Sequence, residues 1–202
     1  MTSGRVVLLN GTSSSGKTTI AEAFKLARAA RDECWLSTGI DDYIAQLPQE
    51  WMGLPVYDGP HRDEGMRLDK VDATRIEIRV GPLWDRLARA YRRTVALWAN
   101  HGFDLIVDEV FLDADVVADW RDVLDGIAVV WVAVRCDLAV MEAREAARGD
   151  RFIGLARGQV DLVYDDASYD LELDTTSRSV ADLVADIEHV IDPRQEQIGP
   201  AV

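Results

Sequence analysis

Short and almost continuous apolar runs alternate along most of the chain with longer stretches in which apolar residues recur at helical spacing. The first run, residues 5–10 (RVVLLN), leads through a glycine- and serine-rich turn into an alanine-rich stretch at residues 18–31. A strand is apolar along its whole length when helices cover both faces of its sheet. The pattern therefore predicts an α/β fold with a parallel sheet between two helical layers. Its strands are expected at residues 5–10, 34–37, 104–108, 127–134 and 169–174.

Amphipathic helices are expected between these strands. In the longest, from Leu83 to about Asn100, apolar residues recur on one side, and Pro82 suits its first turn. This helix could pack on a second copy of the chain or on the sheet; the sheet is the simpler partner, and a homo-oligomer stays an open alternative. The shorter helices are expected at residues 113–124, 138–148 and 180–191, and from Asp41 or Asp42 towards Leu47.

Residues 49–80 interrupt this alternation of strands and helices. Proline and glycine punctuate the first half of the segment, and the alternating residues from Met66 to Val80 predict a hairpin. We interpret the chain as one domain over residues 1–193 with an insertion at residues 46–80. A polar tail at residues 194–202 is expected to be flexible.

Composition and charge fit a single globular domain and exclude several classes of protein. Of the 202 residues, 48% are hydrophobic and 29% are charged, which excludes collagen-like and disordered chains. The 36 acidic and 22 basic residues give a net charge of -14, so nucleic acid is not expected as a partner. No apolar run approaches the roughly 20 residues of a membrane span, and no signal-peptide pattern is present, so we expect a cytoplasmic protein.

Cysteines and histidines are few and widely spaced. Cys34 and Cys136 lie in apolar segments far apart in the sequence, which favours reduced, buried thiols over a disulfide framework. His61, His101 and His189 are also distant from one another, and no spacing typical of zinc ligands occurs. Zinc chemistry is therefore not expected.

Residues 11–18, GTSSSGKT, match the phosphate-binding pattern G-x-x-x-x-G-K-[ST] between an expected strand and an expected helix. In such a loop, backbone N–H groups and the helix N-terminus face phosphate oxygens. Lys17 is expected to reach the β- and γ-phosphates of ATP, and the Thr18 hydroxyl to ligate Mg²⁺. The alternative, a serine-rich turn without a ligand, is disfavoured by the strand and helix on either side. The candidate nucleotide-binding residues are Gly11, Ser13, Ser14, Ser15, Gly16, Lys17, Thr18 and Thr19.

An acidic pair, Asp108 and Glu109, ends the apolar run at residues 105–107. Asp108 is expected to complete the Mg²⁺ site with Thr18, and it is also a candidate for contact with the phosphate acceptor. Glu109 is left open between polarising a water molecule and ordering the waters around the metal.

A kinase also needs a carboxylate that takes the proton of the acceptor hydroxyl. Asp41 and Asp42 follow the second expected strand, at the carboxyl edge where open α/β sheets bind ligands. The alternative role for either residue is to cap the short helix that begins there.

Cations that balance the charge of the transferred phosphoryl group are offered by a glycine-punctuated stretch, EAREAARGDRFIGLARGQ. This stretch could close over the phosphates as a lid. The alternative is a solvated helix face held by salt bridges. Its arginines are Arg144, Arg148, Arg151 and Arg157.

Five segments in this order and spacing resemble chloramphenicol phosphotransferase and its relatives, which are small P-loop kinases that modify an antibiotic hydroxyl. The segments are LLNGTSSSGKT, WLSTGIDDYI, GFDLIVDEVFL, VVWVAVRCDLAVMEAREAARGDR and YDLELDTT. The blocks at residues 134–137 and 147–151 are not general features of P-loop proteins, so the resemblance is more specific than the phosphate loop alone. It implies a fold similar to nucleotide and shikimate kinases, with a five-stranded parallel sheet, and transfer of the ATP γ-phosphate to an alcohol.

The resemblance also implies roles for single residues. The family's catalytic base corresponds to Asp41, and its lid arginines correspond to Arg148 and Arg151, within a lid at residues 148–158. Arg135 matches at a strand end, where it could hold the sheet edge to the lid. The stretch from Asp174 through Thr175 to Thr176 corresponds to the loop near the adenine base.

The sequence departs from this family in the insertion, which is roughly a dozen residues longer than in the chloramphenicol enzyme. The insertion supplies much of the acceptor pocket in the family, so the resemblance does not settle the acceptor. Trp51, Met52, Leu54 and Tyr57 could wall an apolar acceptor or could cover the core. Trp51, Met52 and Tyr57 are the candidate acceptor-binding residues of this segment.

The sequence supports an ATP-dependent O-phosphotransferase that acts on a small-molecule alcohol. An antibiotic acceptor, for resistance or self-protection, is the leading hypothesis, and a primary metabolite or a nucleoside is the alternative. An ATP-binding regulatory protein is the third hypothesis. A GTPase is disfavoured because the guanine-reading [NT]-K-x-D element is missing, and the nearest match, Asp69 to Asp72, precedes the acidic strand.

Overall fold

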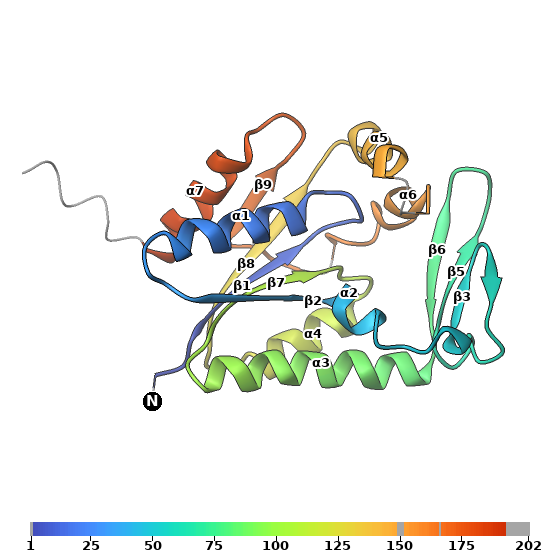
Figure 1. Cartoon of the computed structure of the whole chain (residues 1–202), viewed down its shortest axis with the longest axis horizontal. Helices are drawn as coiled ribbons and strands as arrows, with labels where there is room; N and C mark the ends of the chain where they lie inside the picture. The colour runs from blue at the N-terminus through green and yellow to red at the C-terminus, as the bar shows by residue number, and fades with distance from the viewer. Residues whose placement is uncertain (1, 149–151, 166, 193–202) are drawn as a thin grey trace, which may run out of the picture.

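A five-stranded sheet forms the centre of the structure, a computed structural model that describes residues 2–148, 152–165 and 167–192 (Figure 1). Each neighbouring pair of strands in this sheet is parallel. The prediction of a parallel α/β fold is therefore confirmed. In spatial order the strands are β2 (Trp35–Gly39), β7 (Asp104–Glu109), β1 (Arg5–Asn10), β8 (Ala128–Arg135) and β9 (Leu171–Asp174).

Helices cover both faces of this sheet, as Figure 1 shows. On one face α1 (Lys17–Ala29) and α7 (Val180–Ile191) pack on the sheet, and on the other lie α3 (Pro82–Asn100) and α4 (Ala114–Val123). Strand β1 serves both cores, because Val7 and Leu9 face the first layer while Val6 and Leu8 face the second. The apolar stripe of α3 packs on the sheet, as expected, rather than being left open for a second copy of the chain.

The same alternation separates the two acidic residues at the end of β7. Asp108 faces the phosphate loop, whereas Glu109 points into the layer of α3 and α4 and is only 2% exposed. The Glu109 carboxylate accepts hydrogen bonds from Trp120 Nε1 at 3.1 Å and from the Val110 backbone N–H at 2.7 Å. Burial raises the pKa of Glu109 from 4.5 to about 7, although both hydrogen bonds act in the opposite direction. Glu109 thus ties the end of β7 to α4.

The insertion forms a second sheet with the strand order β4-β3-β5-β6. The predicted hairpin is confirmed, since β5 (Met66–Lys70) and β6 (Ile76–Val80) pair antiparallel. The sequence did not reveal η1 (Gln49–Trp51), β3 (Met52–Leu54) or β4 (Tyr57–Asp58). This sheet does not pair with the central one. It is held against the start of α3 by a small apolar core of Leu47, Met66, Trp84 and Ala88.

Three further helices lie at the carboxyl edge of the central sheet: α2 (Ile40–Ile44), α5 (Leu138–Arg148) and α6 (Leu155–Gln159). Helix α6 was not predicted, because the sequence analysis treated this segment as a lid. Gly149 to Arg151, within the expected lid, and the expected tail at residues 194–202 lie outside the described residues.

The expectation of buried cysteines is wrong. Cys34 is exposed and Cys136 is partly exposed, and both are free thiols. Each lies one residue outside a strand, before β2 and after β8 respectively, where the helical layers no longer cover the chain. Among the helices that the structure describes, none is long and apolar enough to cross a membrane.

The buried carboxyl of Glu109 predicts a specific dependence of stability on pH. Below pH 4.5 the group is protonated in both the folded and the unfolded chain. As the pH rises towards 7, the unfolded chain loses this proton first, so the free energy of unfolding falls. The loss amounts to about 3 kcal/mol at most. Glutamine does not titrate, so Glu109→Gln removes this pH-dependent loss. As the pH rises over this range, the free energy of unfolding of the variant should therefore increase relative to that of wild type.

Urea unfolding at pH 4.5, 6 and 7.5 measures this difference. Glu50→Gln is the matched control, because Glu50 is exposed and its substitution removes the same charge. Parallel stability profiles of wild type and Glu109→Gln would contradict the prediction.

Candidate active site

The phosphate loop, residues 11–18, joins β1 to α1 and packs closely on β8. A side chain at Gly11 would place its Cβ 2.5 Å from the backbone oxygen of Val134, so this close approach requires glycine. Gly16 has a φ of 102°, in the left-handed region that glycine adopts without strain. At both glycine positions of the pattern, a larger residue would therefore be sterically strained.

The polar groups of the loop fit a chain of phosphates. The hydroxyl oxygens of Ser13, Ser14 and Ser15 are buried and have no hydrogen-bond partner among the described residues. Lys17 is 7% exposed, and its Nζ donates to the backbone oxygens of Gly11 and Thr12, at 2.8 Å each. Unpaired hydroxyls and a buried ammonium in a loop of backbone N–H groups are suited to a polyanion.

Thr18 and Asp108 meet as the sequence predicts. The Thr18 hydroxyl donates to Asp108 Oδ2 at 2.7 Å, and Asp108 Oδ1 lies 3.6 Å from Lys17 Nζ. A hydroxyl beside a carboxylate fits Mg²⁺, which takes one or two protein oxygens and completes its shell with phosphate oxygens and water. The described part of the chain contains no group of three or more histidine, cysteine or acidic residues that could hold a metal by itself.

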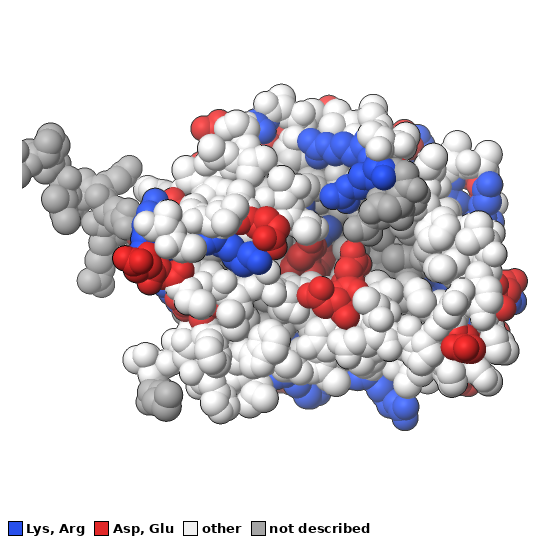
Figure 2. All heavy atoms as spheres, viewed as in Figure 1, with Lys and Arg blue, Asp and Glu red and all other residues white. Residues whose placement is uncertain are grey.

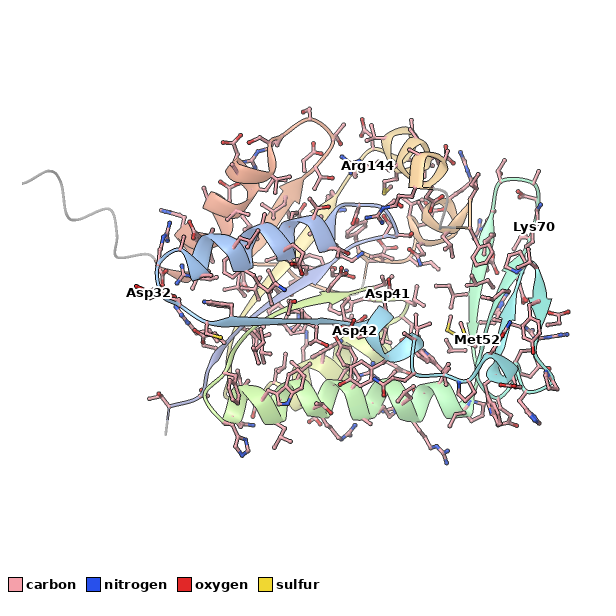
Figure 3. All side chains as sticks on the ribbon, in the orientation of Figure 1. Asp32, Asp41, Asp42, Met52, Lys70 and Arg144 are labelled. Carbon is pink, nitrogen blue, oxygen red and sulfur yellow. The ribbon has the colours of Figure 1, made fainter. Side chains whose placement is uncertain are left out.

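The two aspartates at the start of α2 differ in their contacts. Asp42 Oδ2 accepts hydrogen bonds from the Gly39 backbone N–H at 2.9 Å and from the Thr38 hydroxyl at 3.2 Å, and so closes the capping box of α2. Asp42 therefore performs the capping role that either residue could have taken. Both Asp41 and Asp42 line the cleft at this helix end, and Figure 3 shows them at the start of α2.

A cleft of about 1130 Å³ connects these groups. Figure 2 shows this face of the molecule, where acidic and basic side chains gather around the centre. One half of the cleft is polar and is formed by the phosphate loop, the ends of β2 and β7, and α5. The other half lies between α2, the insertion and α3, and it is mostly apolar, although Asp85, Arg89 and Arg92 of α3 also line the cleft. Its walls include Leu47, Met52, Leu54, Leu68, Ile78 and Trp84.

Most predicted nucleotide-binding residues line the polar half. They are Ser13, Ser14, Gly16, Lys17, Thr18, Thr19, Arg148 and Thr175. Asp108, the predicted metal residue, lines the cleft as well. Gly11 and Ser15 belong to the loop but are not among the residues that line the cleft. Asp174 is not among them either, and its carboxylate accepts a hydrogen bond from the Thr176 backbone N–H at 2.8 Å. Arg151 lies outside the described residues.

On the acceptor side the structure separates the candidates of the insertion. Met52 and Leu54 line the cleft, whereas Trp51 and Tyr57 are not among the lining residues. The Trp51 ring packs against His61 at a centroid distance of 4.4 Å, and Tyr57 lies in β4. Of the four predicted wall residues, the two that are not aromatic therefore line the cleft.

The arginines of the expected lid have different surroundings. Arg148 is exposed and lines the cleft, while Arg157 forms an ion pair with Glu142 at 2.6 Å. Arg144 donates to the Thr175 backbone oxygen at 2.8 Å and to the Ser14 backbone oxygen at 3.4 Å. It therefore connects the phosphate loop with the loop after β9. The i,i+4 spacing of Arg144 and Arg148 on α5 places both arginines on one helix face.

Arg135 lies away from the lid. Its Nε donates to Glu172 Oε2 at 2.7 Å, and its guanidinium lies 4.3 Å from the ring centre of Tyr164. These contacts hold β8 to β9, the last pair of strands in the sheet. Arg135 is not among the residues that line the cleft.

Sequence comparison identifies relatives over almost the whole chain. The family model described as chloramphenicol phosphotransferase-like protein matches residues 4–192. A protein of Mycobacterium tuberculosis, found in two strains and named as an inferred O-phosphotransferase, is 34% identical over 191 residues. This alignment covers 93% of the present chain and 82% of the relative.

Structural comparison identifies P-loop kinases. The APS kinase of Mycobacterium tuberculosis, solved with AMPPNP and APS, superposes with a TM-score of 0.66 at 17% identity and covers 95% of this chain and 99% of its own. The shikimate kinase of Acinetobacter baumannii, solved with shikimate, gives 0.56 at 13% identity and covers 94% of both chains. At these identities the comparison shows a common fold. The match to the family model and the identity with the mycobacterial relatives show that this chain belongs to the chloramphenicol phosphotransferase-like family and is a small-molecule phosphotransferase with the fold of P-loop kinases.

Proposed function

We propose that this protein transfers the γ-phosphate of MgATP to a hydroxyl group on a small molecule with a large apolar surface. The observation that carries this proposal is the single cleft in which Asp41 and the phosphate loop share one space with an apolar wall. A phosphate donor and an apolar acceptor can therefore lie in the same cavity, which the Asp41 carboxylate also lines.

The donor half accounts for ATP. The phosphate loop and Lys17 hold the β- and γ-phosphates, and the loop after β9, which Arg144 ties to Ser14, lies on the side of the base. Thr18 and Asp108 would hold Mg²⁺, which would neutralise charge on the phosphates. The kinase neighbour solved with AMPPNP supports an adenine nucleotide as the donor.

Asp41 acts as the general base. It accepts the proton of the acceptor hydroxyl while the hydroxyl oxygen forms a bond to the γ-phosphorus and the bond to the β-phosphate oxygen breaks, so that ADP leaves. Asp42 is unsuited to this role because its carboxylate closes the cap of α2. Lys17 and Arg148 balance the negative charge on the transferred group.

The apolar half points to the kind of acceptor. A carbohydrate or another strongly hydrated metabolite would lose water against Met52, Leu54, Leu68 and Ile78, because these four side chains offer it no polar partners. The charged side chains Asp85, Arg89 and Arg92 of α3 also line the cleft and can bind polar groups that such an acceptor carries beside its apolar surface. A hydroxylated antibiotic or a similar natural product would bury apolar surface against the same walls. We therefore propose an antibiotic-like acceptor and a role in resistance or self-protection, with cytoplasmic ATP as the phosphate donor.

Acceptor-dependent release of ADP tests the reaction. Purified protein with MgATP should release ADP slowly alone and at least about tenfold faster with a matching acceptor, because a positioned hydroxyl replaces water as the nucleophile. The panel should contain hydroxylated antibiotics, chloramphenicol among them, and polar metabolites and nucleosides, with the product mass recorded in parallel. A mass gain of one phosphate on an apolar acceptor is the expected result. Activity confined to nucleosides or polar metabolites would contradict the proposed acceptor class.

Substitution of the two aspartates tests the assignment of the base. Asp41→Asn should lower kcat about 10²–10⁴-fold and leave the Kd of MgATP unchanged, because it removes the proton acceptor and no phosphate contact. The matched control is Asp42→Asn, which removes the same charge one residue away. Its asparagine oxygen still accepts at the cap, so we expect a rate within about tenfold of wild type and a stability loss of about 1 kcal/mol. Transfer at the full rate by Asp41→Asn would show that another group takes the proton.

A further inference from the structure

Gln159 contacts the phosphate loop from outside the phosphate-binding motif. This residue is the last of α6, is 5% exposed and lines the cleft. Its Oε1 accepts a hydrogen bond from the backbone N–H of Ser13 at 2.6 Å. One N–H group of the loop is therefore already satisfied by the protein itself and is not available to a phosphate oxygen.

This hydrogen bond determines which way the amide of Gln159 faces. A backbone N–H can only donate, so the side-chain oxygen must face Ser13, and the amide nitrogen Nε2 must point away from it. Among the described residues Nε2 donates to no hydrogen-bond acceptor, yet it is not one of the buried polar atoms without a partner. Nε2 is therefore an accessible donor beside the phosphate loop.

The helix that carries Gln159 is held from two sides. Glu145 of α5, which is 1% exposed, accepts from the backbone N–H groups of Gly154 at 2.9 Å and Ala156 at 2.8 Å. On the opposite side, the Ile76 N–H donates to the Gly154 oxygen at 3.0 Å. A Cβ at Gly158 would lie 1.8 Å from the Ile76 oxygen, so α6 and β6 meet backbone to backbone. Gln159 is thus set in place before any ligand binds.

The position of α6 indicates which phosphate Nε2 would meet. Figure 1 shows α6 between the phosphate loop and β6, and β6 contributes Ile78 to the apolar wall of the cleft. The later residues of the loop and the start of α1 hold the α- and β-phosphates. Gln159 Nε2 lies on the side of Ser13 that is nearer to the apolar wall of the cleft. It therefore lies towards the γ-phosphate of a bound nucleotide.

We infer that Gln159 is a ligand of the transferred phosphoryl group, with Oε1 fixed on Ser13 and Nε2 donating to a γ-phosphate oxygen. This inference rests on the proposed function, because it requires ATP in the cleft. The amide would contribute a neutral donor that discriminates ATP from ADP, in addition to the cations Lys17 and Arg148.

Gln159→Glu tests the inference sharply. The carboxylate retains an oxygen for the Ser13 N–H and has nearly the same shape, but it replaces the donor NH₂ by a negatively charged oxygen that repels the γ-phosphate. We expect the Kd of MgATP to rise about tenfold or more, and the Kd of MgADP to change by less than about twofold. Both are measured by isothermal titration calorimetry with the full chain.

Two further variants complete the experiment. Gln49→Glu is the matched control, because it adds the same charge at an exposed glutamine outside the cleft, and both affinities should equal those of wild type. Gln159→Leu removes both polar atoms without adding charge. If Gln159→Glu does not fold in a thermal melt, Gln159→Leu still tests the inference, with a several-fold loss of MgATP affinity expected and a smaller change for MgADP.

The outcomes separate this inference from the function on which it rests. An unchanged ratio of the two affinities, with both nucleotides still bound, would show that Gln159 only supports the loop, and it would overturn the inference while the proposed function stands. An equal loss of both affinities would overturn it in the same way. Failure of the wild-type protein to bind either nucleotide would overturn the proposed function and the inference together.

Discussion

The register of β7 between its two parallel neighbours is the constraint on which the site depends. Asp108 pairs with Leu9 of β1 on one side and with Gly39 of β2 on the other. The first pairing brings the Asp108 carboxylate to the Thr18 hydroxyl, and the second brings the start of α2, with Asp41, to the same sheet edge. Because side chains alternate along a strand, a slip of one residue would turn Asp108 into the helical layer that now holds Glu109.

The acceptor half of the cleft depends on a different kind of contact. The sheet of the insertion is attached to the start of α3 by apolar packing and is not hydrogen-bonded into the central sheet. Helix α6 joins the two halves, because it meets β6 through close backbone contacts and meets the phosphate loop through Gln159. The insertion and the phosphate loop are thus both in contact with one short helix.

The elements that could be predicted from the sequence are those in which the pattern of apolar and polar residues extends over many positions. The central strands, the long helix with its N-terminal proline and the hairpin of the insertion were all expected near their observed positions. Strands β3 and β4, with three and two residues, are too short to show a period of two, and they exist because their partners in the second sheet hold them. The burial of the cysteines was misjudged because each lies one residue beyond its strand, next to the charged residues Glu33 and Asp137.

By itself, the sequence determined the phosphate loop, because the conformation of such a loop depends on eight adjacent residues whose glycines and lysine can be read directly. It also indicated the acidic residue at the end of β7. Tertiary structure alone showed which of the two aspartates caps α2, since only the fold shows that the Asp42 carboxylate accepts from the Gly39 backbone N–H. It also decided the contact of Gln159 with Ser13, two residues 146 positions apart. No local pattern encodes such a pairing, because it results from the packing of α6 between α5 and β6.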